Sequence, residues 1–434
     1  MRMENKKNMV NGNGKPMKSS LSGFHKLDAA GKLQAIKEFS GLTEEDAENL
    51  RKTGALEIEA AERMIENVIG TTELPFGIAT NFLVNGRDYL VPMVLEEPSV
   101  VAAASYAAKL ARPRGGFTSS ADEPEMIGQI QLVKVENPEE ARKKIMLNKE
   151  KIFDMANKCD SVLVKFGGGV RDIETKILDT SRGKMILVHL IVDVRDAMGA
   201  NAVNTMSERV ASFLEELTGA EARLRIISNL ADRRVARSRA VWDREVLGEE
   251  TIERILDAYE LAANDKYRCA THNKGIMNGI DAVTLATAND FRAIEAGAHS
   301  YAARNGSYEP LTRYSKDDEG NLVGEIELPL ALGLVGGATR THPIARIAVK
   351  ILGVKSSKEL AQVVASVGLA QNFAALRALA TEGIQKGHMK LHARNIAVNA
   401  GAEGEDIDRI ARQIVEENNI TVSRAKEILA ERGD

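Results

Sequence analysis

Residues Gly128–Glu140 read GQIQLVKVENPEE, and they decide how the middle of the chain folds. The first eight residues largely alternate between polar and apolar side chains, as those of a half-buried strand do. Asn137 then suits a helix cap, and Pro138 suits the first helical turn. The stretch therefore predicts a strand over Gly128–Val135 that is followed at once by a helix.

A regular pattern of strands and helices continues to residue 229. Ser161–Phe166 and Lys184–Asp193 are rich in β-forming residues, Asn201–Leu217 has helical spacing, and Arg223–Asn229 predicts a last strand. With the first strand and helix, the predicted order is β-α-β-β-α-β, the ferredoxin-like arrangement. Longer helical patterns on both sides predict a larger, mostly helical domain that this unit interrupts. The predicted fold class is α+β.

Both ends of the chain differ from its middle. Residues 1–20 are rich in Asn, Gly, Lys and Ser, so we expect a disordered tail. Near the C-terminus, apolar residues at helical spacing predict a separate helical piece, a mobile flap with glycines as hinges. The predicted parts are the tail (1–20), the large domain (21–123 and 232–383), the small domain (124–231) and the flap (384–434).

Composition excludes several classes of protein. A length of 434 residues suits about three domains, and 44% hydrophobic with 28% charged residues is typical of a soluble protein. A net charge of −4 gives no footprint for nucleic acid. Cys159 and Cys269 lack CxxC spacing, which argues against disulfides and fits the cytoplasm. No signal peptide or long uncharged apolar run is found, the nearest being Met185–Val192, so we expect no membrane contact.

Two glycine-containing segments are candidates for nucleotide binding. Gly167–Gly169 follows a predicted strand, but more strand or turn comes next, whereas a dinucleotide fingerprint needs a helix there. A turn or bulge is therefore favoured. Asp196–Ala202 follows the strand that ends at Asp193 and begins a helix, so its backbone N–H groups can hold a pyrophosphate. A simple helix cap by Asp196 is the alternative.

The predicted topology also places a carboxylate near that helix start. The second and third strands of a ferredoxin-like sheet are adjacent and antiparallel, so Asp160, at the start of the second, is expected at the same sheet edge. There it would accept hydrogen bonds from an adenosine ribose and repel a 2′-phosphate, which favours NAD(H). Lys158 and Lys165 are close in sequence and argue for NADP(H), the alternative.

Three further segments could carry chemistry. Glu97 lies at the start of an apolar run that by itself predicts a capped, buried helix. Lys274 precedes Asp290 by sixteen positions; alone it is an ordinary surface lysine, but between two carboxylates in a dry cleft it would hold an oxyanion. The spacing of His388 and His392 predicts that they share a helix face and could supply two ligands of a zinc site. No HExxH glutamate or third ligand is evident. One of them could instead protonate a thiolate, and for His392 a surface position is the alternative.

Several blocks together resemble hydroxymethylglutaryl-CoA reductase in its soluble bacterial and archaeal form, class II. The match runs from about residue 21 to the C-terminus. The blocks, in the family's order, are Glu66–Gly70, Leu74-Pro75, Asn81-Phe82, Val91–Met93, Glu96–Ser99, Asp196–Asn201, the block around Lys274, Gly333–Thr339 and Gly387–Met389. Glu96-Glu97-Pro98-Ser99 stands where eukaryotic enzymes typically have Thr-Thr-Glu-Gly, and no membrane anchor is present, both of which indicate class II.

The resemblance implies reduction of hydroxymethylglutaryl-CoA to mevalonate and CoA, reversibly, with two hydrides from NAD(P)H and no metal. It implies that Lys274 stabilises the thioester and hemithioacetal oxygens and that Glu97 supplies the proton to the developing alcohol. Asp290 would link and tune these two groups. His388, on the flap, would protonate the departing CoA thiolate. The direction of the reaction in the cell stays open.

The resemblance also implies binding residues and an assembly. The substrate-binding residues would be Ser99, Arg268, Thr271, Asn278, Asn229, Gln371 and Asn372, with Arg268 on the free carboxylate. The cofactor-binding residues would be Asp160, Asp196, Met198, Gly199, Ala200 and Asn201, all in the small domain. The large domain would bind hydroxymethylglutaryl-CoA and form a homodimer with shared active sites, which in some members stacks into hexamers. Glu66–Gly70 would serve the dimer and CoA.

Three other functions remain open on the sequence alone. A different acyl-CoA or aldehyde reductase could use the same lysine and carboxylates. A metal-dependent hydrolase could be built on His388 and His392. A non-enzymatic nucleotide sensor could keep the fold, although the presence of all four reactive groups counts against it.

Overall fold

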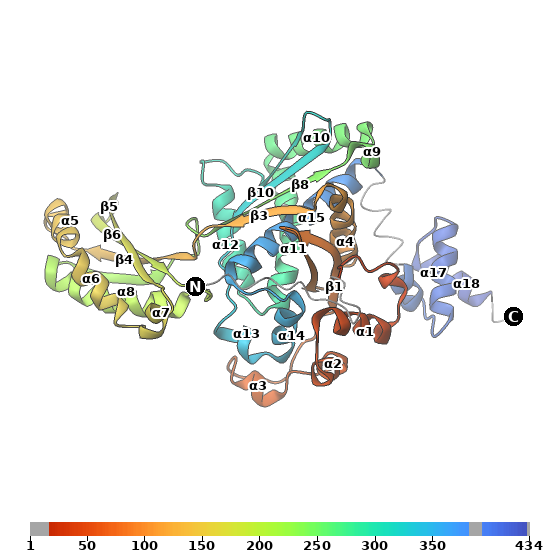
Figure 1. Cartoon of the computed structure of the whole chain (residues 1–434), viewed down its shortest axis with the longest axis horizontal. Coiled ribbons are helices and arrows are strands. Elements are labelled where there is room, and N and C mark those ends of the chain that lie inside the picture. The colour runs from red at the N-terminus through yellow and green to blue at the C-terminus, as the bar shows by residue number, and fades with distance from the viewer. Residues whose placement is uncertain (1–16, 382–392, 432–434) are drawn as a thin grey trace.

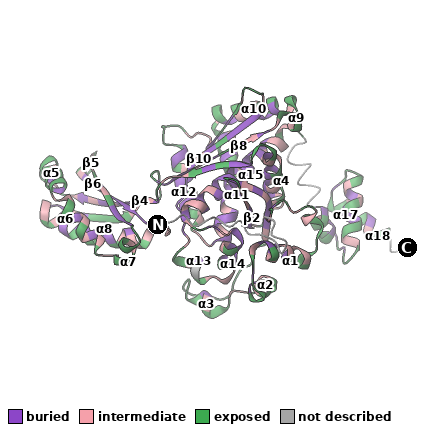
Figure 2. Cartoon of the chain, in the orientation of Figure 1, coloured by how far each residue is buried: buried purple, intermediate pink, exposed green. Residues whose placement is uncertain are grey.

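The computed structural model describes residues 17–381 and 393–431 of the chain. Figure 1 shows a large central domain, a smaller unit of strands and helices on one side, and a helical C-terminal piece on the other. The predicted α+β class is confirmed. Buried residues gather where helices pack against the two sheets (Figure 2).

The large domain is built on a six-stranded sheet with the order β2-β1-β3-β8-β10-β9. The strands are β1 (Phe76–Val84), β2 (Arg87–Val94), β3 (Phe117–Ala121), β8 (Val235–Trp242), β9 (Thr312–Lys316) and β10 (Leu322–Pro329). The helices are η1 (Phe24–Lys26), α1 (Ala29–Ser40), α2 (Glu44–Arg51), α3 (Ile58–Glu62), α4 (Val100–Ala111), η2 (Arg112–Arg114), α9 (Arg244–Leu247), α10 (Glu249–Asn264), α11 (Lys266–Ala286), α12 (Phe291–Ala302), α13 (Gly337–Thr341), α14 (Pro343–Leu352) and α15 (Ser357–Ala380).

Helix α15 is the centre of the large domain and packs against the sheet, α4 and α11. Phe373 on this helix is fully buried and stacks on Trp242 of β8, with ring centroids 3.9 Å apart and planes inclined by 6°. The indole N–H of Trp242 donates to the carbonyl oxygen of Ala107 on α4, at 3.2 Å. One aromatic pair thus joins a central helix, a central strand and the helix that follows Glu97.

The small domain contains a four-stranded antiparallel sheet with the order β5-β6-β4-β7. Its strands are β4 (Glu125–Val133), β5 (Gly169–Thr180), β6 (Gly183–Asp193) and β7 (Glu221–Ile227), and its helices are α5 (Pro138–Leu147), α6 (Lys149–Asn157), α7 (Ser161–Lys165) and α8 (Ala200–Thr218). The chain passes from β4 through three helices to β5 and β6, and then through α8 to β7. This is the predicted β-α-β-β-α-β order.

The predicted second strand, Ser161–Phe166, is wrong: these residues form α7 and its C-cap. Asp160 caps this helix, its carboxylate accepting a hydrogen bond from the backbone N–H of Leu163 at 2.8 Å. A short apolar run does not distinguish strand from helix by periodicity, and here the cap decides. The true second strand is β5. The glycines before it form a turn, with φ of 84° at Gly167 and 109° at Gly169, as predicted.

Two other predictions need correction. The tail was predicted to extend to residue 20, yet Ser19 is fully buried, and its backbone N–H donates to a carboxylate oxygen of Asp88 at 2.8 Å. The longest uncharged apolar stretch was predicted at Met185–Val192, which is part of β6. Among the described residues, α15 is the helix long and apolar enough to suit a membrane span, but 67% of its most apolar window is buried, as in a core helix.

The C-terminal piece has a hydrophobic core of its own. Helical residues 393–399 precede α17 (Asp406–Glu416) and α18 (Val422–Ala430), so the predicted helical spacing is confirmed. Ile410, Ile414 and Ile428 are among the buried side chains that form this separate core. The predicted hinge glycines Gly383 and Gly387 lie outside the described residues.

We expect Phe373→Ala to be strongly destabilising, because it removes a ring from the stack on Trp242 at the centre of the core. The free energy of unfolding should fall by about 3–5 kcal/mol, as for other buried aromatic residues replaced by alanine. Denaturant titration measures it. Leu379→Ala on the same helix is the control, since Leu379 is 41% exposed and should change stability little. Equal losses in both variants would contradict the role of the aromatic stack.

Candidate active site

The structure brings Glu97 and Lys274 together. The ammonium nitrogen of Lys274 lies 2.9 Å from Glu97 Oε2, and the amide Nδ2 of Asn278 lies 3.4 Å from Glu97 Oε1. Glu97 comes from the loop between β2 and α4, whereas the other two residues lie on α11. The side chain of Lys274 is 60% exposed and that of Glu97 is 35% exposed. A single chain therefore assembles this ion pair but leaves it open to water.

Helix α11 displays the predicted substrate residues on one face. Arg268, Thr271, Lys274 and Asn278 are spaced by three or four residues, which aligns them along the helix. His272, Asn273, Ile276 and Met277 face the core instead and are buried. Asp265 begins the helix by accepting a hydrogen bond from the backbone N–H of Arg268 at 2.7 Å. A continuous polar strip thus runs along the exposed side of a core helix.

Arg268 is suited to bind an anion. Its guanidinium is half-buried, and among the described residues it has no carboxylate partner. Burial lowers the pKa of Arg268, because the charged form has lost water that no counter-charge replaces. A carboxylate on a bound molecule would supply that charge and a bidentate contact.

Two further predicted substrate residues carry unsatisfied polar atoms. The hydroxyl of Ser99 and Oε1 of Gln371 are both buried, and neither has a hydrogen-bond partner within the described part of the chain. Ser99 also has φ of 78°, a left-handed conformation that is unusual for serine. Buried polar atoms without partners and a strained backbone are typical of ligand-binding positions.

Asn372 and Asn229 differ from this pattern. Oδ1 of Asn372 accepts hydrogen bonds from Thr312 (3.0 Å) and Tyr314 (2.9 Å), and its Nδ2 donates to the carbonyl oxygen of His272 at 3.2 Å. Its amide is therefore engaged inside the protein. Burial lowers the pKa of His272 to about 3, so this ring is neutral. Asn229 is exposed, where the chain leaves β7. The substrate contacts expected of both asparagines stay predictions.

The Asp196–Asn201 segment forms the junction between the two domains. Gly199 precedes α8 with φ of 104°, and no side chain caps the helix, so its first N–H groups are open to an anion. Asp196 is not the cap: its carboxylate accepts a hydrogen bond from the backbone N–H of Ser357 in the large domain, at 2.7 Å. Its carbonyl oxygen accepts one from Leu334 at 2.8 Å. The segment is therefore fixed from outside the small domain.

Arg234 is a structural residue of this junction that the sequence reasoning missed. It is 5% exposed, and its guanidinium donates to the carbonyl oxygens of Ala197 (3.0 Å) and Leu332. Burial lowers its pKa to about 10 despite the charge of Asp196. The only signal in the sequence was an arginine five residues after the predicted strand Arg223–Asn229, and an arginine is usually a surface residue.

In the described part of the chain, Asp290 makes no hydrogen bond or ion pair with Lys274. Its carboxylate caps α12, accepting hydrogen bonds from the backbone N–H groups of Arg292 (3.1 Å) and Ala293 (3.2 Å). The preceding residue, Asn289, is bonded through its N–H to the carbonyl oxygen of Thr284, ten residues after Lys274. Ten helical residues span about 15 Å. The predicted triad of Glu97, Lys274 and Asp290 is therefore incomplete in the single chain.

Asp290 lies near the Asp196–Asn201 segment instead. The amide oxygen of Asn289 accepts a hydrogen bond from the N–H of Gly333 at 2.8 Å. A Cβ atom on Gly333 would lie only 2.6 Å from the backbone nitrogen of Met198, so the two loops are in close contact. Each chain thus has two separated groups of predicted site residues, which we call half-sites: one with Glu97 and Lys274, the other with Asp290 and the open start of α8.

Asp160 does not begin the second strand of the small sheet, as the sequence had predicted. β5 begins at Gly169, opposite Asp193, and the carboxylate of Asp193 at that edge is occupied by Arg171 (2.8 Å) and Arg195. Asp160 begins α7 instead, whose Leu163 lies against Gly168. A Cβ atom on Gly168 would be 2.7 Å from the carbonyl oxygen of Asp193, so α7 packs against this edge. The cofactor role of Asp160 stays a prediction.

The other predicted catalytic residue, His388, and its neighbour His392 lie outside the described residues. Within the described ranges, no three His, Cys, Asp or Glu side chains gather as a metal site would require. Ile69, in the Glu66–Gly70 block between α3 and β1, is fully exposed at 102% of its reference area. Large apolar side chains in such positions commonly mark an interface.

Comparisons with known proteins identify the family. Residues 28–393 match the family model described as hydroxymethylglutaryl-coenzyme A reductase. The chain belongs to this family. It is 58% identical to the 3-hydroxy-3-methylglutaryl-coenzyme A reductase of Archaeoglobus fulgidus, over 95% of this chain and 94% of that protein. It is 38% identical to the probable reductase of Borreliella burgdorferi, over 77% of each.

Solved structures agree with this assignment. The reductase of Streptococcus pneumoniae matches with a TM-score of 0.81 and 40% identity, over 95% of this chain and 99% of that one. A structure of the class II enzyme of the same organism, bound to NADPH in open conformations, matches with a TM-score of 0.80 and 41% identity, over 83% and 100%. As a member of this reductase family, the chain is an NAD(P)H-dependent oxidoreductase of hydroxymethylglutaryl-CoA.

One half-buried carboxyl pair joins α11 to α12, the helices that carry the two half-sites. Burial, with a hydrogen bond from Asp281 to Glu295, raises the pKa of Asp281 to about 8. Glu295 is in turn paired with His299 at 2.6 Å. Asp281 is therefore protonated at neutral pH, and its carboxyl O–H donates a hydrogen bond to the carboxylate of Glu295.

This pair predicts how stability depends on pH. A carboxyl group with a raised pKa stabilises the fold in its protonated form, fully below the unfolded pKa of about 3.9, and that contribution is lost as pH rises to about 8. Asp281→Asn, which stays neutral, should therefore gain stability relative to the wild type as pH rises from 5 to 8. Denaturant titrations at several pH values measure this difference. Asp257→Asn, at an exposed position on α10, is the control and should show no such trend.

Proposed function

We propose that the chain interconverts hydroxymethylglutaryl-CoA and (R)-mevalonate plus CoA at a site shared between two subunits. The observation that carries this proposal is the Glu97–Lys274 ion pair at 2.9 Å, on the helix face that also bears Arg268 and Thr271. An ammonium group there can hold the carbonyl oxygen while Arg268 binds the carboxylate at the other end of the substrate.

The second subunit supplies what one chain lacks. Thr284, against which the chain turns before Asp290, is about 15 Å along α11 from Lys274, so we assign to Lys274 the Asp290 of the partner subunit. The open start of α8 lies in the same half-site as Asp290 and would then present the nicotinamide nucleotide across the interface. The exposed apolar segment around Ile69 supports this homodimer. A further stacking to hexamers is left to experiment.

The residues divide the chemistry as follows. Two molecules of NAD(P)H, bound in turn, would supply one hydride each. Lys274 stabilises the negative oxygen that forms when the thioester carbonyl is reduced, and again when the aldehyde is reduced. His388 gives a proton to the CoA thiolate as it leaves. Glu97 then gives a proton to the alcohol oxygen of mevalonate, and Asp290 orients the pair. The start of α8, with Met198, Gly199, Ala200 and Asn201, binds the pyrophosphate.

A hybrid dimer tests the shared site. We expect Lys274→Ala and Asp290→Ala each to lower kcat by at least ~10²-fold. A hybrid of one subunit of each kind, purified through two different tags, should recover about half the wild-type activity, because one of its two sites receives an intact Lys274 and an intact Asp290. Activity is measured as oxidation of NAD(P)H by hydroxymethylglutaryl-CoA.

The matched control is a hybrid of Glu97→Gln with Lys274→Ala. Both residues lie in the same half-site, so each site of this hybrid has one defect and should stay inactive. If the first hybrid also stays inactive, Lys274 and Asp290 do not meet across subunits. If neither single variant loses activity, the assigned reaction site is wrong.

We propose further that NAD(H) is preferred, with NADP(H) as the alternative. The carboxylate of Asp160 at the start of α7 supports this preference, because it would accept hydrogen bonds from a ribose and repel a 2′-phosphate. The NADPH-bound relative from Streptococcus pneumoniae is the precedent for the alternative. Two free cysteines support a cytoplasmic location.

The nucleotide preference can be measured directly. The wild type should have a higher kcat/KM with NADH than with NADPH, and Asp160→Ala should narrow or invert that ratio by removing the repulsion. Asp154→Ala, at an exposed position on the neighbouring helix α6, should leave the ratio unchanged. A clear preference of the wild type for NADPH would remove the proposed role of Asp160.

A further inference from the structure

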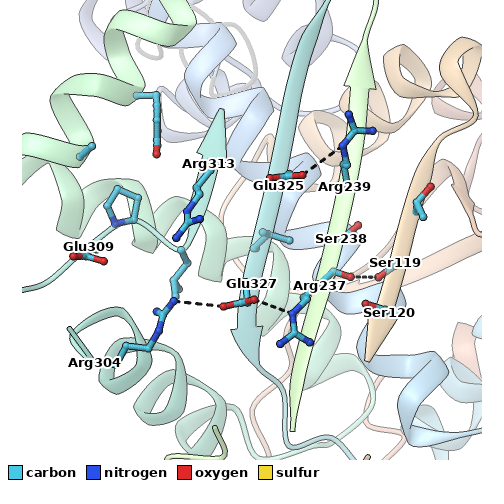
Figure 3. A pocket seen from close by; sticks show the side chains of 16 residues that line it. Ser119, Ser120, Arg237, Ser238, Arg239, Arg304, Glu309, Arg313, Glu325 and Glu327 are labelled. Atoms are coloured by element: carbon cyan, nitrogen blue, oxygen red, sulfur yellow. Dashed lines mark hydrogen bonds and ion pairs between the residues drawn. The ribbon is translucent and has the colours of Figure 1, made fainter. Parts of the chain in front are cut away.

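A cavity of about 520 Å³ lies on the outer side of the large sheet, away from α15. Its floor is formed by β3, β8, β10 and β9, and its walls by α10 and the loop Arg304–Leu311 (Figure 3). We call it the outer-sheet cavity. Its volume is within the range of small-molecule sites, and its lining is strongly charged, with four arginines and three glutamates.

Most of these charges neutralise one another. Glu327 accepts from Arg237 at 2.8 Å and from Arg304 at 3.4 Å, and Arg237 also contacts Asp122 at 2.8 Å. Two residues further along the same two strands, Glu325 pairs with Arg239 at 3.4 Å. Figure 3 shows the contacts of Glu327 with Arg237 and Arg304, and that of Glu325 with Arg239, as dashed lines.

Arg313 is the exception. In the strand register it stands beside Glu325, which is also opposite Arg239, so one carboxylate faces two guanidinium groups. Glu325 contacts Arg239 instead, so the guanidinium of Arg313 makes no hydrogen bond or ion pair with the described residues. The third carboxylate, Glu309, accepts from Asn305 at 3.1 Å and makes no ion pair with Arg313. The guanidinium of Arg313 is therefore left without a carboxylate partner among the described residues.

A second donor stands near this free guanidinium. Tyr259 of α10 lines the same cavity, and its hydroxyl has no hydrogen-bond partner within the described ranges. Burial raises the pKa of Tyr259, with the charge of Arg313 opposing it, so the phenol is protonated and can donate. Thr118 and Ser120 on β3 line the far side of the cavity, three strands from Arg313. A guanidinium with a nearby phenol donor is complementary to a carboxylate or a phosphate.

The cavity is separate from the Glu97–Lys274 pair. Its wall loop is tied to the buried side of α11, where Asn273 donates to the carbonyl oxygen of Glu309 and accepts from the N–H of Leu311, both at 3.0 Å. Lys274 follows Asn273 in the chain but lies on the exposed side of α11. A molecule in the outer-sheet cavity would therefore not occupy the substrate face of the helix.

We propose that the outer-sheet cavity binds a small anion, whose carboxylate or phosphate group is held by Arg313 and Tyr259. The proposal concerns a second site and does not depend on the reductase mechanism. A phosphate and a carboxylate offer the same chemistry to these donors, so both are used as probes.

Isothermal titration calorimetry on the full-length protein tests the proposal. Inorganic phosphate and malonate are titrated separately, each with excess NADH, CoA and mevalonate present so that the nucleotide site, the CoA site and the substrate-carboxylate site at Arg268 are filled. We expect one saturable site per chain for at least one probe. Arg313→Gln should weaken that binding by about tenfold or more, as removal of a charged hydrogen-bonding partner does. Tyr259→Phe, which keeps the ring, should weaken it by a smaller factor.

The matched control is Arg182→Gln, at the exposed turn between β5 and β6 in the small domain. This variant removes the same charge and should bind the probes as the wild type does. The Tm of Arg313→Gln should equal that of the wild type without probe, which separates lost binding from lost folding. Absence of saturable binding to both probes, or equal binding by wild type and Arg313→Gln, would overturn the proposal.

Discussion

The rigidity of α11 is the constraint on which the proposed function depends. A hydrogen-bonded helix keeps its residues at fixed distances, so the backbones of Lys274 and Thr284 stay about 15 Å apart along α11, and beyond Thr284 the chain turns to the start of α12. The carboxylate of Asp290 is engaged at that start as a cap. The separation of the half-sites is therefore built into the backbone.

A second constraint fixes the half-site that contains Asp290 and the start of α8. Burying a guanidinium is costly unless its donors are satisfied, and Arg234 meets this requirement by donating to carbonyl oxygens of Ala197 and Leu332, one on each side of the domain junction. Asp196 adds a contact to the first turn of α15. The loop before α8 is thus held by the large domain, although α8 belongs to the small one. Motion of the small domain would have to carry this loop with it or break these bonds.

The sequence predicted the parts of the fold in which local and global preferences agree. The β4–α5 stretch has alternating side chains followed by a clear helix cap, and β6, α8 and β7 were placed close to their observed bounds. Ser161–Phe166 failed because its β-branched residues favour a strand, whereas the Asp160 cap and the glycines that follow permit only a helical turn. Ser19 failed because composition says nothing of a single hydroxyl buried by a partner 69 residues away.

The candidate site was predictable as a set of residues but not as an arrangement. Glu97 and Lys274 meet as the resemblance implied, while Asp290 could be placed only once the length of α11 and its C-terminal turn were known. Arg234 carried no motif, because its role comes from burial alone.

Exposure of the Glu97–Lys274 pair links catalysis to assembly. An ion pair with side chains 60% and 35% exposed is screened by water and contributes little to stability, so the single chain gains little from forming it. The same charges act far more strongly on a substrate oxygen once water is excluded, because the effective dielectric constant falls. A second subunit that covers the polar strip of α11 would exclude that water and at the same time bring in Asp290. The charges needed for the reaction would then become effective only in the assembled enzyme, when substrate and nucleotide are held between the two half-sites.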